Sequence, residues 1–559
     1  MRKKFVQIAA FVLALTLLPV FPATAAPAGE NETMIRVGLY YGSTALDGAN
    51  LENSVGSGFQ FGYYDNSNQF MELGSTEQTK ISVVKTSNVY YGSYNDYTSY
   101  HEELTTSSVA VGCYHVQLPG VYATYAEAAL AASQYEGGFA AYIGGAFYAR
   151  VGNFVDRSGA QALQAQLAAS GAASEIVGTT SYGVSVVITG TNTILFQYDD
   201  QGSGTGLGIQ PKQTNSAEKP VTWFKKYKWY GGFRYERING GDLTVVNLVS
   251  LEDYIRGILP YEMSNSWPLE ALKAQAVCAR SYTMTNQNRH SAYHFDICNT
   301  THCQVYYGTG SANATTDRAV DETYGQYAWY GGEICQTYYH SCDGGATENS
   351  GNVWSSDLPY LRGVVDPYEA SVASKISGYS WTKTYTGKEL QERMNNYGYT
   401  SCAEVADVRV TKTTPTGNVY SVTVTDVNGK TFTISKDYVR IVFGVSSLRY
   451  TISGGSGNGG YSVAGGGALD SVSGAWAIDG NGNRLQIGGG TVYAITGDGI
   501  QSVTASSSGS SSNGSFVFSG TGKGHNVGMS QWGAYAMAQQ GYTYEEILKF
   551  YFSGIEIHA

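Results

Sequence analysis

Residues 251–284 read LEDYIRGILPYEMSNSWPLEALKAQAVCARSYTM, and this stretch decides the fold of the central domain. Ser250 and the two acidic residues that follow Leu251 are typical of a helix N-cap, and apolar side chains then recur at helical spacing until Pro260 ends that helix. A second helix is predicted to begin at Trp267-Pro268, because proline is favoured at the first helical position. Glu262 lies between the two helices. Burial there would raise the pKa of its carboxyl toward neutrality, as a general acid requires.

The composition describes a large β-rich chain with an uncharged polar surface. Its 559 residues suffice for three or four domains, and only 14% are charged, against about 25% in typical proteins. The 70 Gly and 46 Tyr residues supply a turn-rich polar surface, which is typical of proteins that act outside cells and contact carbohydrate. The net charge of −11 argues against nucleic acid as a partner. The 7 cysteines cannot all pair, which leaves room for a metal site or for free thiols.

Residues 1–26 have the pattern of an export signal. A basic start precedes an apolar run from Phe5 to Phe21, and small residues follow up to Ala26. The run is about 17 residues long, close to the length of a membrane-spanning helix, so a retained anchor is the alternative to a cleaved signal. In both cases we expect the rest of the chain outside the cytoplasm, in the extracellular space or cell wall, or anchored to a membrane and facing outward.

Two segments precede the central domain. Residues 34–90 alternate as strands do, and we expect them to belong to the catalytic domain, which the next segment would then interrupt. Residues 109–190 change periodicity in the order of a compact βαββαβ unit, with the last strand at 182–188. The stretches YHVQLPGVYATYAEAALAA (114–132) and AAYIGGAFYARVGNFVDRSGAQALQAQL (140–167) resemble a SPOR domain. That resemblance implies binding of glycan strands stripped of their stem peptides; the alternative is a generic small α+β domain.

Three further segments are read from local composition. Residues 201–220 are rich in Gly, Ser, Lys and Pro, which predicts a linker. Residues 223–230 interleave cations and aromatics, and in an acidic chain this favours a β-hairpin with a polar face over a surface for single-stranded nucleic acid. Residues 451–515 are predicted to form a Gly/Ser-rich β insertion, which separates a core at 221–450 from its C-terminal part at 516–559.

Four blocks resemble the SpoIID/LytB family in the family's order. They are residues 251–284, DICNTTHCQVYYG (296–308), TYYHSCDGGATENSGNVWSSDLPYLRGVVDP (337–367) and GKGHNVGMSQWGAYAMAQQGYTYEEILKFYF (522–552). The sporulation members of this family are lytic transglycosylases that act on peptidoglycan. The resemblance implies a multidomain α+β protein with a β-rich catalytic domain. It also implies cleavage of the MurNAc-GlcNAc β-1,4 bond with formation of 1,6-anhydromuramoyl ends, in sporulation or cell-wall remodelling.

The resemblance places the catalytic acid/base at Glu262 and further active residues at Arg280, Tyr360 and Arg362. One carboxyl suffices for this reaction, because it protonates the glycosidic oxygen and then accepts the proton of the muramoyl 6-hydroxyl. The two arginines would bind substrate carboxylates and stabilise charge near the cleaved bond. Taken alone, a glutamate beside a proline is usually a solvated surface residue, so its burial has to be shown.

The family's WGHGVGMSQWGA pattern is changed here at Lys523 and Asn526, which affects the shape of the loop. Hydrogen bonding within this Gly-rich turn is the alternative role for its three polar residues, His525, Ser530 and Gln531. The polar residues that we expect to line the substrate cleft are Gln275, Ser341, His525, Ser530 and Gln531.

His294, Cys298, His302 and Cys303 fall close together in sequence, a density of nitrogen and sulfur ligands that suits tetrahedral Zn²⁺. His290 is the alternative to His294, and a Cys298–Cys303 disulfide is the alternative to a metal site. The segment is similar to the zinc-binding segment of some SpoIID members. Four protein ligands would make the zinc structural, so that it orders the loop beside the catalytic acid. We expect Cys335 and Cys342 to form a disulfide or to be two buried thiols. Cys278 is expected in the core.

Two other classes of function stay open. Relatives named LytB enhance an amidase, so the same fold without activity of its own would bind glycan and present it to a cell-wall amidase. A zinc hydrolase that uses His294 and His302 is the other class, and it lacks the His-Glu-x-x-His helix of such enzymes.

Overall fold

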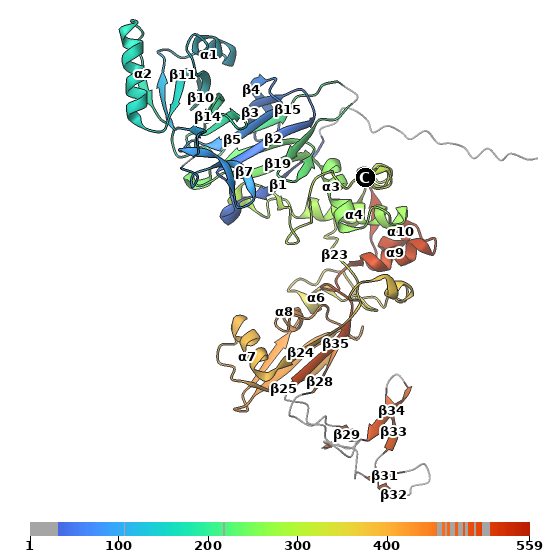
Figure 1. The fold of residues 1–559 in the computed structure, drawn as a ribbon. Coiled ribbons are helices and arrows are strands. Elements are labelled where there is room, and N and C mark those ends of the chain that lie inside the picture. The colour runs from blue at the N-terminus through green and yellow to red at the C-terminus, as the bar shows by residue number, and fades with distance from the viewer. Residues whose placement is uncertain are drawn as a thin grey trace, which may run out of the picture. The chain divides into compact units, whose positions relative to one another are not determined.

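The computed structural model describes residues 32–105, 107–215, 218–454 and 515–559, together with the backbone of short strands between 461 and 505 (Figure 1). The predicted export signal at 1–26 lies outside the described residues. Within the described ranges, no helix has the length and apolarity needed to cross a membrane. Several sheets, with helices between their strands, make up the fold, which confirms the α+β, β-rich class.

A seven-stranded sheet joins the start of the described chain to the central segment, in the order β20-β1-β19-β18-β15-β3-β4. β1 runs antiparallel to β19, with Met34 opposite Ser250, and parallel to β20 on its other side. Strands from residues 34–76 and from 207–250 therefore share one sheet across the segment between them. The bounds are β1 (Met34–Tyr40), β3 (Phe59–Tyr64), β4 (Phe70–Thr76), β15 (Leu207–Pro211), β18 (Gly232–Glu236), β19 (Thr244–Ser250) and β20 (Ile297–Cys298).

A ten-stranded sheet has the order β12-β9-β11-β10-β14-β13-β5-β2-β16-β17. β10 pairs antiparallel with β11 on one side and parallel with β14 on the other. It thereby connects β12, β9 and β11 to the rest of the sheet. The bounds are β2 (Gly48–Val55), β5 (Lys80–Lys85), β9 (Tyr114–Gln117), β10 (Gly138–Ile143), β11 (Ala146–Phe154), β12 (Glu175–Val177), β13 (Val184–Ile188), β14 (Ile194–Asp199), β16 (Val221–Phe224) and β17 (Tyr227–Trp229).

The helices α1 (Tyr125–Ala132) and α2 (Arg157–Ala169) complete a βαββαβ order over residues 114–177 (Figure 1). Each begins at a side-chain cap: Thr124 Oγ1 accepts from Glu127 N, and Asp156 Oδ1 accepts from Gly159 N. The sixth element differs from the prediction, because β12 takes the place expected for residues 182–188. Those residues form β13 instead, which pairs with β5 and β14 and is buried through most of its length.

Two segments read from composition have different outcomes. Residues 207–211 of the predicted linker form β15, which lies between β18 and β3 with Leu207 and Ile209 fully buried. Its apolar residues alternate with glycine and glutamine, and this strand signal was hidden by the Gly/Ser-rich residues before it. The hairpin predicted at 223–230 is confirmed, since β16 and β17 pair antiparallel around a turn in which Lys225 has a φ of 59°.

The helices at 251–285 follow the sequence with one correction. Ser250 caps α3 (Leu251–Glu262) by accepting from Asp253 N, but the helix continues through Pro260 to Glu262. Proline removes only one backbone donor so close to the C-terminus, and the last turn is kept. α4 (Leu269–Thr285) packs its Leu272, Ala276 and Ala279 into the core. The remaining helices around this pair are α5 (Ala314–Glu322), α9 (Gln531–Gln539) and α10 (Tyr544–Tyr551).

Smaller sheets complete the described chain. β24, β35 and β28 form one three-stranded sheet, and β25, β26 and β27 form another. β28 and β35 flank the predicted insertion at 451–515, most of which lies outside the described residues. The bounds are β6 (Val89–Tyr94), β7 (Tyr97–His101), β8 (Ala110–Val111), β21 (Tyr327–Tyr330), β22 (Glu333–Ile334), β23 (Tyr339–His340), α6 (Ser350–Val353), β24 (Ser380–Thr386), α7 (Gly387–Asn396), β25 (Val405–Thr413), β26 (Val419–Asp426), β27 (Thr431–Ser435), α8 (Tyr438–Ile441), β28 (Tyr450–Gly454), β35 (Ser515–Thr521), β36 (Met529–Ser530) and β37 (Glu556–His558).

Candidate active site and metal centre

Glu262 is the last residue of α3, and its carboxyl is held from the loop that follows β20. Val305 N donates to Glu262 Oε1 at 2.8 Å. Burial raises the pKa of the Glu262 carboxyl, while hydrogen bonds from Val305, Gln531 and Tyr339 act in the opposite direction. A carboxyl whose pKa is raised by burial keeps its proton closer to neutral pH, which a general acid needs.

The carboxyl faces a cavity of about 660 Å³. Among the described residues that line this cavity, Glu262 is the only carboxylic acid, and Arg289 and Lys523 supply positive charge. Aromatic side chains from two further segments form much of the remaining wall. The lining residues are Glu262, Tyr282, Arg289, Thr301, His302, Cys303, Val305, Tyr338, Tyr339, His340, Ser341, Trp354, Lys523, Gly524, His525 and Gln531.

A chain of hydrogen bonds fixes the direction in which the Tyr339 hydroxyl donates. Tyr254 donates its hydroxyl proton to Gln304 Oε1 at 3.3 Å. The Thr283 hydroxyl is shared between Gln304 Oε1, at 2.9 Å, and the carbonyl of Ala279, at 2.7 Å. The amide nitrogen of Gln304 then donates to Tyr339 Oη at 3.2 Å. Because the Tyr339 oxygen already accepts this bond, its own proton is available to the neighbouring carboxyl of Glu262. The sequence did not mark Tyr339, since its approach to α3 depends on the long-range pairing of β23 with β36.

Three of the five polar residues expected in the cleft line it: Ser341, His525 and Gln531. Gln531 Nε2 donates to the backbone oxygen of Glu262 at 3.0 Å and to Gln275 Oε1 at 3.4 Å, so Gln275 lies behind the cleft. Ser530 caps α9 by accepting from Gly533 N and is fully buried away from the cavity. Ser530 therefore has the alternative role, that of a local hydrogen-bond partner, and does not line the cleft.

Arg280 is fully buried and does not line the cavity. Its guanidinium makes a bidentate ion pair with Glu252, at 2.8 and 2.7 Å, and its Nη1 donates to the carbonyl of Gln326 at 3.1 Å. The structure therefore corrects the expected contact with substrate: in this arrangement Arg280 joins α4 to the first turn of α3.

Tyr360 and Arg362 also lie outside the cavity lining. Tyr360 Oη accepts from the backbone nitrogen of Gln336 at 2.9 Å. Arg362 is partly exposed at the surface, where it pairs with Asp357 at 2.7 Å. The cations within the cavity are instead Arg289 and Lys523, and no recognised motif had marked Arg289.

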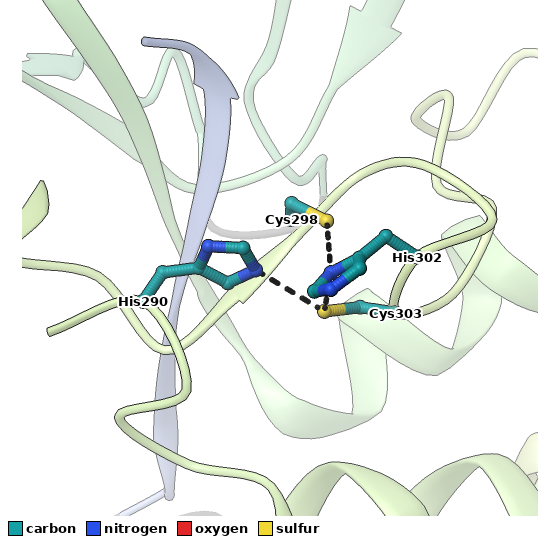
Figure 2. Close-up of side chains that lie close together, drawn as sticks. All are labelled: His290, Cys298, His302 and Cys303. Atoms are coloured by element: carbon teal, nitrogen blue, oxygen red, sulfur yellow. Dashed lines mark hydrogen bonds between the residues drawn. The ribbon is translucent and has the colours of Figure 1, made fainter. Parts of the chain in front are cut away.

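Four nitrogen and sulfur side chains meet next to the cleft: the ligand atoms of His290, Cys298, His302 and Cys303 all lie within 4.8 Å of one another. Figure 2 shows the two imidazoles directed at the two sulfur atoms. His302 Nδ1 is 3.7 Å from Cys298 Sγ and 3.6 Å from Cys303 Sγ, and His290 Nε2 is 3.4 Å from Cys303 Sγ. With ordinary Zn–N and Zn–S bonds, a tetrahedral ion separates these ligand types by about 3.5 Å. The residues present therefore fit Zn²⁺.

His294 is not part of this cluster, which corrects the ligand set in favour of His290. His294 has a left-handed backbone with a φ of 58°, and its Nδ1 lies 2.7 Å from Glu236 Oε1. β20 pairs with β1 and so fixes Cys298. The same loop continues through Cys303 to Val305, which holds the Glu262 carboxyl. The cluster of two histidines and two cysteines is therefore connected to the residue that holds Glu262 by a few residues of backbone.

The other described cysteines are free thiols. Cys278 and Cys335 are buried near each other, and burial raises the pKa of both thiols. Cys342 is fully buried in a separate apolar cluster with Val372, Ile376 and Ala536. A Cys335–Cys342 disulfide is thus absent from the described structure. The two residues are buried thiols, which is the alternative given above.

The match to known proteins covers this site. Residues 239–330, which include α3, α4 and the four side chains His290, Cys298, His302 and Cys303, match the family model SpoIID, described as stage II sporulation protein. An uncharacterized protein of Brachyspira hyodysenteriae is 31% identical over 339 residues, 59% of this chain and 72% of that protein. Stage II sporulation protein D of Bacillus subtilis is 27% identical over 328 residues, 56% of this chain and 75% of that protein. The chain belongs to the SpoIID family.

The amidase enhancer of Bacillus subtilis is also similar to this SpoIID chain. The two are 30% identical over 312 residues, which are 54% of this chain and 39% of the enhancer. The SpoIID chain therefore spans less than half of that relative.

The βαββαβ segment of this SpoIID chain buries polar residues on the side of its sheet opposite to the apolar side chains packed on α1 and α2. Arg150 Nη1 donates to Gln197 Oε1 at 2.6 Å, and Gln197 Nε2 donates to His115 Nε2 at 3.0 Å. His115 and Gln197 are fully buried and Arg150 is 4% exposed. These three side chains are hydrogen-bonded to one another inside the protein, so they are not available to bind a ligand at the surface.

Proposed function

We propose that this SpoIID chain is a lytic transglycosylase that cleaves the MurNAc-GlcNAc β-1,4 bond of peptidoglycan and leaves 1,6-anhydromuramoyl ends. The observation that carries the proposal is the single carboxyl in the described cavity lining, partly buried and with a raised pKa. A hydrolytic glycosidase uses two carboxyls, one as acid and one as base or nucleophile. An intramolecular attack by the substrate's own hydroxyl needs only one.

In the proposed reaction, protonated Glu262 gives its proton to the glycosidic oxygen as the bond from this oxygen to C1 of MurNAc breaks. The resulting carboxylate accepts the proton of the 6-hydroxyl, and O6 forms a new bond to C1 of the same sugar. One proton leaves Glu262 and one returns, so the residue is regenerated and no water is consumed. The Tyr339 hydroxyl stabilises the carboxylate between the two transfers.

The remaining cavity residues suit a glycan substrate. Trp354 and Tyr338, whose ring centroids lie 4.6 Å apart, offer apolar faces to sugar rings. Arg289 and Lys523 offer positive charge to the lactyl carboxylate of MurNAc. Peptide-stripped strands are the proposed substrate, because binding by a SPOR-like segment at 109–190 would select the same polymer.

We also propose that His290, Cys298, His302 and Cys303 hold a structural Zn²⁺. Four protein ligands leave no open position, so the ion, when bound, orders the loop that carries Val305. The proton transfers remain with Glu262. Export through the segment at 1–26, and a role in sporulation or wall remodelling, are part of the same proposal; the name of the Bacillus subtilis relative supports the sporulation setting.

A second function is favoured by a specific similarity, that to the amidase enhancer. In this alternative the chain binds glycan and presents it to a cell-wall amidase without cutting it. Incubation of peptide-stripped glycan with the protein and with Glu262→Gln separates the two, when the products are read by mass spectrometry. Anhydromuramoyl products from the native protein alone support the transglycosylase. Intact glycan in both samples, together with increased turnover of an added amidase, supports the enhancer.

A further inference from the structure

Three buried carboxylates converge outside the catalytic cavity. The ligand oxygens of Asp343, Asp366 and Glu369 lie within 4.8 Å of one another, and none of these residues is more than 3% exposed. Asp343 follows β23, and the other two lie in the segment that enters the 3-10 helix Glu369–Lys375. Three like charges at this spacing repel one another strongly in a dry interior, so the cluster needs neutralisation.

Glu369 is surrounded by donors. Its Oε2 accepts from the backbone nitrogen of Asp343 at 2.8 Å and from Ser530 Oγ at 2.6 Å, and its Oε1 accepts from Gly344 N at 2.7 Å. Donors on both oxygens favour the ionised form of a carboxyl. Burial nevertheless raises the pKa of the Glu369 carboxyl, and these three hydrogen bonds act in the opposite direction.

Asp366 has a similar set of partners. Its Oδ1 accepts from the backbone nitrogens of Tyr368 and Glu369, at 2.7 and 3.1 Å, and its Oδ2 accepts from Tyr551 Oη at 2.6 Å. Both oxygens of Asp366 are therefore hydrogen-bonded to the protein.

Asp343 differs from both. Its Oδ1 accepts from Gly345 N at 2.7 Å, but its Oδ2 is buried and accepts no bond from a donor among the described residues. The Asp343 side chain lies instead within hydrogen-bonding reach of another carboxyl, that of Asp366. Buried polar atoms are nearly always partnered, so this oxygen points to a group that the protein itself does not provide. The charges that face Asp343 are those of the two other carboxylates.

We infer that Asp343, Asp366 and Glu369 bind one Ca²⁺. Carboxylate oxygens are the ligands of hard cations, whereas Zn²⁺ favours the nitrogen and sulfur cluster beside the cleft. Mg²⁺ keeps several waters and is rarely held in an all-protein cage, while Ca²⁺ accepts buried carboxylates in irregular geometry. The ion would join the loop after β23 to the 366–369 segment. Through Ser530 it would also anchor the start of α9, where Gln531 reaches the backbone of Glu262.

The alternative occupant is a proton. Burial and the neighbouring carboxylates raise the pKa of Asp343 well above its usual range, so without a cation this carboxyl takes up a proton. The variant Asp343→Asn separates the two cases, because an amide has the shape of a protonated acid and no charge for an ion. Asp426→Asn is a matched control, since Asp426 is another buried carboxylate that accepts only backbone donors.

The test uses the full chain, treated with a Ca²⁺-selective chelator and then titrated with CaCl₂ by calorimetry and by thermal unfolding. We expect one Ca²⁺ per chain, and a folded-to-unfolded ratio that rises about 100-fold when the free ion is a hundred times its Kd. Asp343→Asn should lose this response, and Asp426→Asn should keep it. The inference is overturned if calorimetry finds no site, if Asp343→Asn responds like the native protein, or if Mg²⁺ acts equally well. Calorimetry on the native chain shows whether the Ca²⁺ site exists even if Asp343→Asn does not fold.

Discussion

The buried pair between Arg280 and Glu252 gives the sharpest structural prediction. Arg280 is fully buried, and its guanidinium bonds to both oxygens of Glu252 on the far side of α4 from the cavity lining. Removing one partner from a buried ion pair leaves the other charge uncompensated and costs about 3–5 kcal/mol. Because the side chain of Glu252 is 12% exposed, we expect the lower end of this range, about 3 kcal/mol, for Arg280→Met and for Glu252→Gln.

The two substitutions should be strongly non-additive, since each removes the same interaction. The free energy of unfolding is measured in urea for both single variants and for the double variant, and kcat is measured well below all unfolding midpoints. We expect the double variant to be no less stable than either single variant, and both singles to lose activity only as they unfold. The reasoning is refuted if folded Arg280→Met loses kcat while Glu252→Gln keeps it, because Arg280 would then act on the substrate directly.

Three further predictions concern protons and metal. Tyr339→Phe removes a donor that stabilises the Glu262 carboxylate, so the pKa of Glu262 should rise. The basic limb of the pH profile of kcat should then move to higher pH, because the acid keeps its proton longer. A basic limb that does not move contradicts the proposed hydrogen bond. Cys303→Ser should lower the zinc content measured by mass spectrometry and the unfolding temperature, whereas His294→Ala should keep the zinc; loss of zinc from His294→Ala contradicts the ligand set. Burial lowers the pKa of His115 from 6.5 to about 4, so between these pH values the imidazole is protonated in the unfolded chain and neutral in the native protein. The free energy of unfolding should therefore fall by up to about 3 kcal/mol as the pH falls from 6.5 to 4. His115→Gln should lessen this decline in urea unfolding, and an equal decline in the variant assigns it to other groups.

The sequence predicted those features that depend on local patterns. Ser250, the apolar spacing after it and Trp267-Pro268 placed two helices correctly, and the density of His and Cys located three of the four side chains that converge beside the cleft. Spacing alone did not choose between His290 and His294, because that choice depends on a left-handed turn at His294 and on Glu236 from another strand.

Long-range contacts account for what was missed. Tyr339, Arg289 and Trp354 enter the cavity from different parts of the chain. Tyr339 and Trp354 lie in a block that resembles the family, but local sequence did not show that their side chains reach the cavity. Arg280 was expected near substrate because a family motif contains it, yet the helical period turns it toward Glu252. β15 was read as linker because composition averages over a window longer than one short strand.

The central claim is that Glu262 directs an intramolecular attack instead of hydrolysis. The most direct measurement is mass spectrometry of products formed from peptide-stripped glycan in H₂¹⁸O, with Glu262→Gln as the paired sample. We predict muramoyl ends that are lighter by one water than hydrolytic ends, that contain no ¹⁸O, and that the variant does not form. Ends that carry ¹⁸O, or unchanged anhydro products from Glu262→Gln, would contradict the account.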